Sequence, residues 1–212
     1  MITTDICIIG AGPGGAATAL KLDRMGMPCV LIDKATFPRD KVCGDALSGK
    51  VLAILNRIDP AMMERFEATQ KAIDVWGVKF VAPNETELDI AFVAKEKMYQ
   101  QKSPGFVARR IDFDNFLIDE VRQCEHVDFH EGVKITEYRK VEGGYEVSDD
   151  SGQLQIRCRL LIDSSGAHSI FSRKFGGIKK EDHHYAAAVR AYYKNVHHFT
   201  EGNLIELHFV KD

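Results

Sequence analysis

The 212-residue sequence has no long hydrophobic run, and its longest apolar stretches, such as residues 186–189, are far too short to span a membrane. The first residues lack the basic segment of a signal peptide and lead at once into an apolar pattern. Neither sign of charge dominates, since the formal net charge is −3. We therefore expect a cytoplasmic protein without a transmembrane segment, and we do not expect nucleic acid as a partner.

The sequence also lacks the cysteine spacing of a zinc site or a disulfide framework, because its five cysteines are an odd number and none forms a C-x-x-C pair. Cys7 and Cys29 lie inside apolar strand patterns, so we expect small core residues. Neighbouring residues on a strand point to opposite faces, so adjacent histidines do not make a joint metal site. We predict no metal site and surface positions for the paired histidines, His183, His184, His197 and His198.

What the sequence does contain is a strand–turn–helix–strand pattern at its start. Residues 5–10 read DICIIG, an apolar run typical of a buried parallel strand. The turn GAGPGG at 10–15 follows, then a helix-forming stretch, and then a second apolar run, PCVLID at 28–33. This order is the first βαβ unit of a dinucleotide-binding fold.

Each conspicuous residue of this unit has a physical task. Gly10 permits the tight turn, Gly12 lets the backbone approach a pyrophosphate, and Gly15 lets the helix pack closely. Free N–H groups and the helix dipole then favour phosphate. Asp33 lies 18 residues after Gly15, where an acid accepts hydrogen bonds from a ribose. A glycine turn without a ligand is the alternative reading. Asp33 disfavours NADP at this site but does not separate FAD from NAD.

The rest of the chain mixes helices and short strands. A stripe of apolar residues after Asp112, the expected N-cap, predicts a helix with a core-facing side. Two further helices are expected at 46–57 and after Pro60. The predicted strands lie at 72–81, 87–94, 186–196 and 203–210, in one sheet, and at 126–158, where the last three form a meander. Residues 160–166 are expected as a separate parallel strand whose loop reaches a ligand edge.

Three stretches carry a resemblance to a known family: GAGPGGAATA with Asp33, FPRDKVCGDALSG at 37–49, and ARRIDFDNFL with LLIDSSGAHSIFSRKFG. In the first, Ala19 completes a GxGxxGxxxA pattern. The chain resembles the FAD-dependent oxidoreductases of the aromatic hydroxylase type, and within them most closely the geranylgeranyl reductase family. The family's Asp-Gly loop is replaced here by Ser165-Gly166, with Asp163 two residues earlier.

The resemblance implies an α/β fold, in which a Rossmann-like FAD-binding domain has a parallel sheet and a β-meander. It places that domain at 1–71 and 105–178, and part of an inserted, mainly β substrate domain at 72–104 and 179–212. The family's later Gly-Asp motif is absent from the sequence. The chain therefore looks like the N-terminal part of a longer enzyme and is expected to be inactive by itself, or to be a non-catalytic FAD-binding fragment.

The resemblance also implies the roles of individual residues. The pyrophosphate would lie on the glycine turn, the adenosine ribose at Asp33 and Lys34, and the adenine against the backbone of Val133. Arg39, Cys43 and Gly44 would approach the flavin side, and Arg109 would clamp the cofactor from the start of a helix. The implied cofactor-binding residues are Gly10, Ala11, Gly12, Pro13, Gly14, Gly15, Asp33, Lys34, Arg39, Cys43, Gly44, Arg109, Val133 and Gly166.

Cys43 has two interpretations. In one, its thiol lies beside the flavin or substrate, its thiolate favoured by Arg39 and Lys41 and opposed by Asp45, and it is the candidate catalytic proton donor. In the other, it is a small residue that tight packing against the ring requires. The resemblance implies nearness to the flavin but not proton transfer.

The implied activity is reduction of C=C bonds in an isoprenoid or other apolar substrate, with FAD as cofactor and NAD(P)H as electron donor. A monooxygenase or halogenase on the same fold is the nearest alternative. A simple NAD-dependent dehydrogenase is disfavoured by the long β-rich insertion after the first unit. A small-molecule or lipid substrate is the expected partner, and a lipid would leave peripheral membrane contact open.

Overall fold

The computed structural model describes residues 1–179, 181–184, 186–197 and 199–211. Its contacts divide the chain into two compact units. The first unit comprises Met1–Lys41 and Ile111–Ala188, and the second comprises Val42–Arg110 and Val189–Asp212. Residues 42–71 and 105–110, expected in the same domain as the glycine turn, thus belong to the other unit by contacts.

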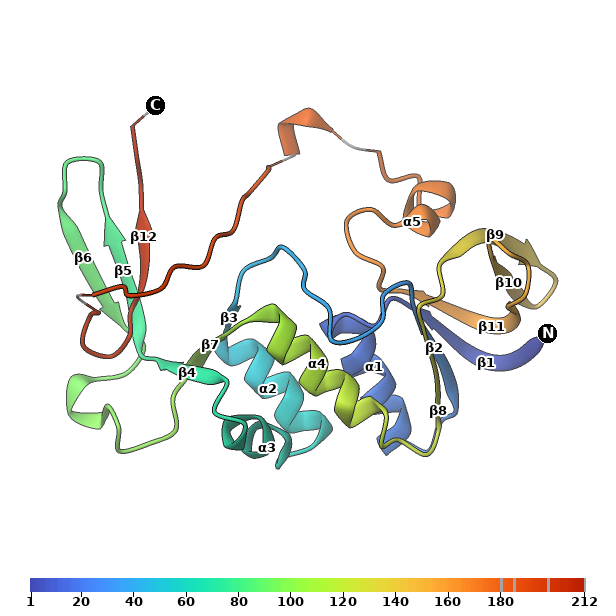
Figure 1. Cartoon of the computed structure of the whole chain (residues 1–212), viewed down its shortest axis with the longest axis horizontal. Helices are drawn as coiled ribbons and strands as arrows, with labels where there is room; N and C mark the ends of the chain where they lie inside the picture. The colour runs from blue at the N-terminus through green and yellow to red at the C-terminus, as the bar shows by residue number, and fades with distance from the viewer. Residues whose placement is uncertain (180, 185, 198, 212) are drawn as a thin grey trace. The chain divides into compact units, whose positions relative to one another are not determined.

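The first unit is built on a six-stranded sheet with the strand order β8-β2-β1-β11-β10-β9. The first four strands are parallel to their neighbours, and β10 and β9 continue antiparallel (Figure 1). The strands are β1 (Ile2–Ile9), β2 (Cys29–Asp33), β8 (Val127–Glu131), β9 (Ile135–Val141), β10 (Gly144–Asp149) and β11 (Gln155–Asp163). The predicted parallel sheet and meander are confirmed.

The two faces of this sheet are covered differently. Helix α1 (Pro13–Arg24) packs against β1, β2 and β8. The alternation of a strand sends Cys7 and Ile9 to the other face, where they join a buried cluster that includes Tyr138 and Val147 of the meander. Helix α5 (Ile170–Phe175) adds Phe171 to that cluster. The carboxyl ends of β1 and β2 therefore emerge from a sheet that is packed on both sides.

Strand β11 corrects the prediction of two separate strands at its position. The residues read as the last meander strand and those read as a parallel strand form one nine-residue strand, which pairs antiparallel with β10 and parallel with β1. Its burial alternates as far as Cys158, and then two consecutive residues, Arg159 and Leu160, are exposed before Leu161 is buried. This break in the alternation is what made one strand look like two.

Helix α4 (Arg110–Val121) begins earlier than predicted. Asp112, expected as its N-cap, lies inside its first turn. An acid there still complements the positive end of the helix dipole, which explains why the residue type signalled a helix start three residues late. The apolar stripe itself is core as predicted, with Phe113, Leu117 and Ile118 buried.

The second unit contains two three-stranded sheets, with the orders β3-β7-β4 and β12-β5-β6. The predicted strand at 72–81 is therefore two strands in different sheets, separated at the buried Trp76. The pairing of β12 with β5 confirms that the C-terminal segment returns to this region. The elements are β3 (Ala46–Leu47), α2 (Gly49–Ile58), α3 (Met62–Ala68), β4 (Ala72–Val75), β5 (Gly77–Val81), β6 (Glu87–Ala91), η1 (Lys95–Lys97), β7 (Gly105–Ala108) and β12 (Ile205–His208).

The β12-β5-β6 sheet has one apolar and one charged face. The register places Lys79 beside Glu87 and Asp89 on the charged face, with Nζ–O distances of 2.5 and 3.6 Å. Every residue that the register aligns on the other face is apolar: Val78, Phe80, Leu88, Ile90, Ile205 and Leu207. Within the second unit much of this apolar face is open, since Leu88 is 58% and Ile90 is 47% exposed.

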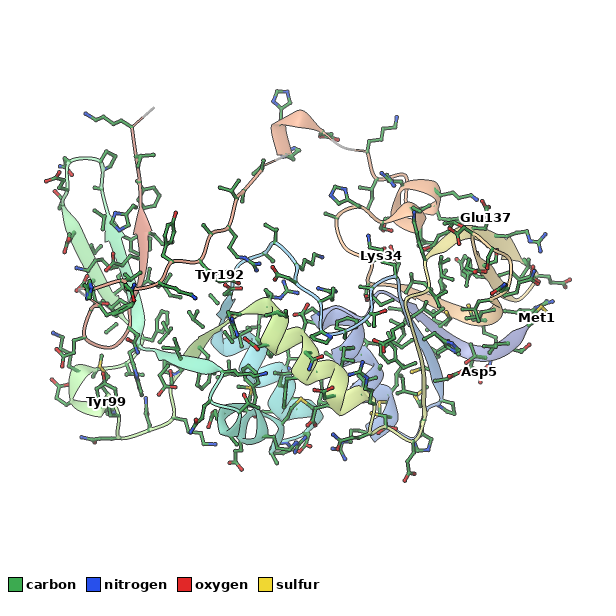
Figure 2. The ribbon with its side chains drawn as sticks, in the orientation of Figure 1. Met1, Asp5, Lys34, Tyr99, Glu137 and Tyr192 are labelled. Atoms are coloured by element: carbon green, nitrogen blue, oxygen red, sulfur yellow. The ribbon has the colours of Figure 1, made fainter. Side chains whose placement is uncertain are left out.

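The predicted strand at 186–196 is wrong, because these residues form neither helix nor strand. Asp45 anchors the part that belongs to the second unit. It accepts a hydrogen bond at 2.9 Å from the hydroxyl of Tyr192, which is labelled in Figure 2, and its carboxylate lies 3.5 Å from the Arg190 guanidinium. Tyr192 and Tyr193 in this segment are 53% and 81% exposed. The apolar composition misled the prediction.

The two strand cysteines are buried, and the described members of the histidine pairs are exposed. Cys7 and Cys29 are 0% and 2% exposed, as expected of core residues, and burial raises the pKa of the Cys29 thiol to about 11. The described members of the histidine pairs, His183, His184 and His197, are exposed, while His198 lies outside the described residues. Within the described part of the chain, no helix has the length and apolar character to cross a membrane.

Candidate functional site

The glycine turn joins the carboxyl end of β1 to the start of α1. Gly10 has a positive φ of 97°, and a Cβ there would lie 2.5 Å from the carbonyl oxygen of Ser164. A Cβ on Gly15 would lie only 1.8 Å from the carbonyl oxygen of Gly10. Both positions therefore need glycine for the reasons predicted, a tight turn and close packing of the helix.

The amino end of α1 is open for an anion. Gly12 is its N-cap and provides no side-chain cap, Pro13 follows it, and no acid lies in the first turn. Among the described residues, nothing lies within 4 Å of the point that a Cβ on Gly14 would occupy. Uncapped N–H groups and the helix dipole at this end suit a phosphate group.

Asp33 has a structural task that the sequence did not predict. It is 8% exposed, and its two oxygens accept hydrogen bonds from the N–H groups of Ala11 at 2.7 Å and Ala35 at 2.8 Å. The carboxylate thus ties the glycine turn to the loop after β2. Each carboxylate oxygen has a second lone pair, so the arrangement leaves room for a ribose hydroxyl, which stays a prediction.

A pocket of about 230 Å³ opens beside these residues. Lys34 and Val133, both predicted to contact the adenosine, line it. Lys34 is labelled in Figure 2. The sequence did not point to Tyr138, whose pKa burial raises to about 12, so that its phenol stays neutral. The lining residues are Ile9, Gly10, Ile32, Asp33, Lys34, Val133, Lys134, Ile135, Tyr138, Ser165, His168, Ile170 and Arg173.

Arg39 lies close to the glycine turn. Its Nη2 atom is 3.5 Å from the point that a Cβ on Gly12 would occupy. Its Nη1 atom is 2.9 Å from Oδ2 of Asp114, a residue of α4 whose side chain is fully buried. Sequence reasoning missed Asp114, although an acid three residues before Leu117 and seven before Val121 shares a face with an apolar stripe and so signals a buried partner.

The loop after β11 approaches the same edge of the sheet. Ser164 donates its N–H to the carbonyl of Ile9 at 2.7 Å, and Gly166 has a positive φ of 85°. Lys41 places its Nζ 3.2 Å from the point that a Cβ on Gly166 would occupy. Gly166 therefore lies at the glycine-turn edge of the sheet, and its contact with a cofactor stays a prediction.

Asp163 anchors this loop. Its carboxylate accepts hydrogen bonds from the hydroxyls of Ser165, Ser169 and Ser172. Partial burial acts to raise the pKa of Asp163, but these hydrogen bonds outweigh it and hold the pKa below its usual value. The acid two residues before Gly166 thus orders the loop from within.

Three predicted site residues belong to the second unit. Cys43 is an exposed free thiol in a bend, and Gly44 follows it. Arg109 is exposed and directly precedes α4. The contacts of Cys43 and Gly44 with the flavin side, and of Arg109 with the cofactor, remain predictions. Among the described residues, no group of three or more histidine, cysteine, aspartate or glutamate side chains is arranged to hold a metal ion.

The sequence matches a family described as FAD binding domain over residues 3–205. The chain belongs to this FAD-binding domain family. The features of the first unit fit FAD: a glycine cradle, an uncapped helix end and a pocket beside Asp33. The α/β fold and the resemblance to FAD-dependent oxidoreductases are thereby confirmed.

Curated relatives include both halogenases and reductases. The chain is 29% identical to a 1H-pyrrole-2-carbonyl-[peptidyl-carrier protein] brominase of Pseudoalteromonas luteoviolacea, over 91% of the chain and 45% of the relative. It is 28% identical to a menaquinone reductase of Mycobacterium tuberculosis, over 90% and 44%. It is 27% identical to digeranylgeranylglycerophospholipid reductase 2 of Methanosphaera stadtmanae, over 83% and 42%. The chain thus spans less than half the length of these relatives.

Solved structures agree on the fold. A flavoprotein/dehydrogenase from Cytophaga hutchinsonii superposes with a TM-score of 0.67 at 26% identity, covering 82% of this chain and 42% of that one. The p-nitrophenol 4-monooxygenase from Pseudomonas putida superposes with a TM-score of 0.68 at 19% identity, covering 83% and 44%. The second likeness shows the fold alone.

Proposed function

We propose that the protein is the FAD-binding part of an FAD-dependent oxidoreductase that reduces C=C bonds of an isoprenoid or other apolar substrate, with NAD(P)H as electron donor. The main support for the proposal is the glycine turn. It lies at the uncapped start of α1, in a chain that belongs to the FAD-binding domain family. The similarity to menaquinone and digeranylgeranylglycerophospholipid reductases favours an apolar substrate over a polar one.

When bound, FAD would supply the redox chemistry. The chain's own residues would bind and orient it. The N–H groups at the start of α1 would hold the pyrophosphate, with the Arg39 guanidinium beside them. The pocket lined by Asp33, Lys34 and Val133 would receive the adenosine. Cys43 is kept as a proposed contact of the flavin side, and Arg109 as a proposed contact of the cofactor.

The second unit offers support for an apolar substrate. The open face of the β12-β5-β6 sheet is apolar, whereas its other face has the Lys79 ion pairs. Burying that apolar face against a hydrocarbon chain is favourable by about 25 cal/mol for each Å² removed from water. A polar substrate would gain nothing from this surface.

The test is an anaerobic reaction of the intact gene product. We expect NADH or NADPH to bleach the bound flavin, and menaquinone or a geranylgeranylated glycerophospholipid to restore its colour with stoichiometric loss of a C=C bond. Absence of flavin reduction by either nicotinamide would contradict the proposed electron donor. Reduction of the flavin without reoxidation by any apolar alkene would contradict the proposed substrate.

A halogenase is the second candidate, because the brominase of Pseudoalteromonas luteoviolacea is as similar to this chain as the reductases are. It predicts that the reduced protein consumes oxygen and incorporates bromide or chloride into an added substrate. The two candidates are separated by oxygen, since the reductase reaction proceeds under argon and the halogenase reaction does not.

A further inference from the structure

We infer that Asp114 is a positioning residue that holds the Arg39 guanidinium over the glycine turn, ready to contact the pyrophosphate of FAD. The inference rests on the proposed function, since it requires FAD to bind at the start of α1. It assigns a ligand-directed task to an acid of α4, a helix that otherwise supplies core residues.

The two terminal nitrogens of the Arg39 guanidinium lie beside different groups, Asp114 and the glycine turn. Nη1 of Arg39 lies 2.9 Å from Oδ2 of Asp114, with side-chain exposures of 17% and 0%. Nη2 lies 3.5 Å from the point that a Cβ on Gly12 would occupy. The planar guanidinium is rigid, so fixing one terminal nitrogen on a buried acid fixes the direction of the other.

The backbone that carries Arg39 is also fixed. Phe37 donates its N–H to Oε2 of Glu131 at 2.9 Å, and its buried ring lies 5.0 Å below the Arg39 guanidinium carbon. Gly132 donates its N–H to the carbonyl of Ala35 at 3.1 Å. Because a long side chain loses rotamer freedom when it binds a ligand, an arginine that is already ordered binds with a smaller entropic cost.

Asp114 also has an electrostatic effect of the opposite sign. A carboxylate beside Arg39 offsets part of the positive charge that attracts an anion. If neutralisation were its main effect, removing the charge of Asp114 would strengthen the binding of a pyrophosphate. If positioning dominates, the same change weakens it. The direction of the change therefore decides between the two.

The experiment compares Asp114→Asn with the unaltered protein by calorimetric titration of FAD, ADP and adenosine. We expect the Kd for FAD and for ADP to rise about tenfold, the loss of one charge-assisted contact, and the Kd for adenosine to stay the same. Asp119→Asn is the matched control, because Asp119 lies on the same helix but pairs with Arg122 at the surface. It should leave all three constants unchanged.

A double variant tests whether Asp114 acts through Arg39. In an Arg39→Gln background, Asp114→Asn should cause almost no further loss of ADP affinity. Equal or tighter ADP binding by Asp114→Asn alone would overturn the inference, and so would equal losses for ADP and adenosine, which indicate a general structural defect. If the unaltered protein binds neither FAD nor ADP, the proposed function fails and the inference falls with it.

A measurement on the unaltered protein covers the case in which Asp114→Asn does not fold. In the ligand-free protein, NMR of arginine labelled with ¹⁵N at its terminal nitrogens should show separate Nη signals for Arg39, assigned by their loss in Arg39→Gln. Separate signals report restricted rotation of the guanidinium. A single averaged signal would overturn the inference, because the side chain would then not be ordered before the ligand binds.

Discussion

At the scale of single residues, the glycines of the turn are not equivalent. A Cβ on Gly15 would lie 1.8 Å from a backbone oxygen, whereas the position of Gly14 is open among the described residues. A side chain at Gly15 must therefore push α1 away from the turn. The sequence pattern alone treats both as parts of one motif, and only the packing distinguishes them.

We predict that Gly15→Ala lowers the free energy of unfolding by about 1–3 kcal/mol, as overpacking does, and also weakens FAD binding. Gly14→Ala is the matched control, and in the ligand-free protein it should be neutral or stabilising by up to about 1 kcal/mol, because alanine is the better helix former. Urea unfolding of both variants measures the difference. Equal stability of the two would contradict this account of the turn.

Asp163 gives a prediction about pH. Its folded-state pKa is held below the unfolded value by serine hydroxyls, so it stabilises the fold at pH values above its unfolded pKa. That contribution is lost as the pH falls through the folded-state pKa, which lies below the usual aspartate value of about 3.9.

Asp163→Asn should therefore lower the free energy of unfolding at pH 7 by about 1–2 kcal/mol, the cost of losing hydrogen bonds to a charged group. Towards pH 3 the difference from the unaltered protein should shrink, because its own carboxylate becomes protonated. Urea unfolding at pH 7, 5 and 3 measures this. A difference that is the same at all three pH values would show that the charge of Asp163 does not contribute.

At the scale of elements, we predict that substitutions on the two faces of the β12-β5-β6 sheet have different effects on the binding of an apolar molecule. Leu88 is 58% exposed on the apolar face, so Leu88→Gln should change the free energy of unfolding by less than about 0.5 kcal/mol. It should nevertheless reduce the fluorescence of a bound apolar dye. Glu87→Gln, on the charged face of the same strand, is the control and should leave the fluorescence unchanged. A dye signal insensitive to Leu88 would mean that the apolar face is not a binding surface.

Elements with a strong and uninterrupted local signal were predicted from the sequence, and elements with an interrupted or a short pattern were not. The first βαβ unit combines a buried run, a glycine turn and an acid, all of which are local. Strand β11 was read as two strands because its alternation breaks at Arg159 and Leu160. Strand β7 was not predicted from the sequence, because its partners, β3 and β4, lie far from it in sequence.

Some features of the candidate site could be predicted from the local sequence, and others could not. Gly10 and Gly15 follow from local backbone requirements and could be predicted, as could the position of Asp33 at the end of β2. The Asp33 hydrogen bond to Ala11, the Arg39–Asp114 pair and the lining of the pocket by His168 and Arg173 depend on contacts between distant segments. No spacing rule within one segment specifies such contacts.

At the scale of the whole molecule, the central claim is that the first unit binds FAD. The chain spans less than half the length of its curated relatives. FAD binding by the first unit can be tested on this chain. The pocket at Asp33 and Val133 would take the adenosine half of the cofactor. FMN lacks the adenosine half. A much lower affinity for FMN than for FAD would therefore distinguish this site from a surface that binds any flavin.

The most direct test is therefore a titration of the purified protein with FAD, FMN and NAD, followed by flavin absorption and fluorescence and by calorimetry. The account predicts binding of one FAD per chain, with FMN at least about a hundredfold weaker, because FMN lacks the adenosine and the second phosphate that the pocket and the turn would recognise. NAD has both groups but lacks the flavin, so we expect it to bind more weakly than FAD through the loss of the proposed flavin contacts. Tighter binding of NAD than of FAD, or no binding of FAD by this chain or the longer protein, would contradict it.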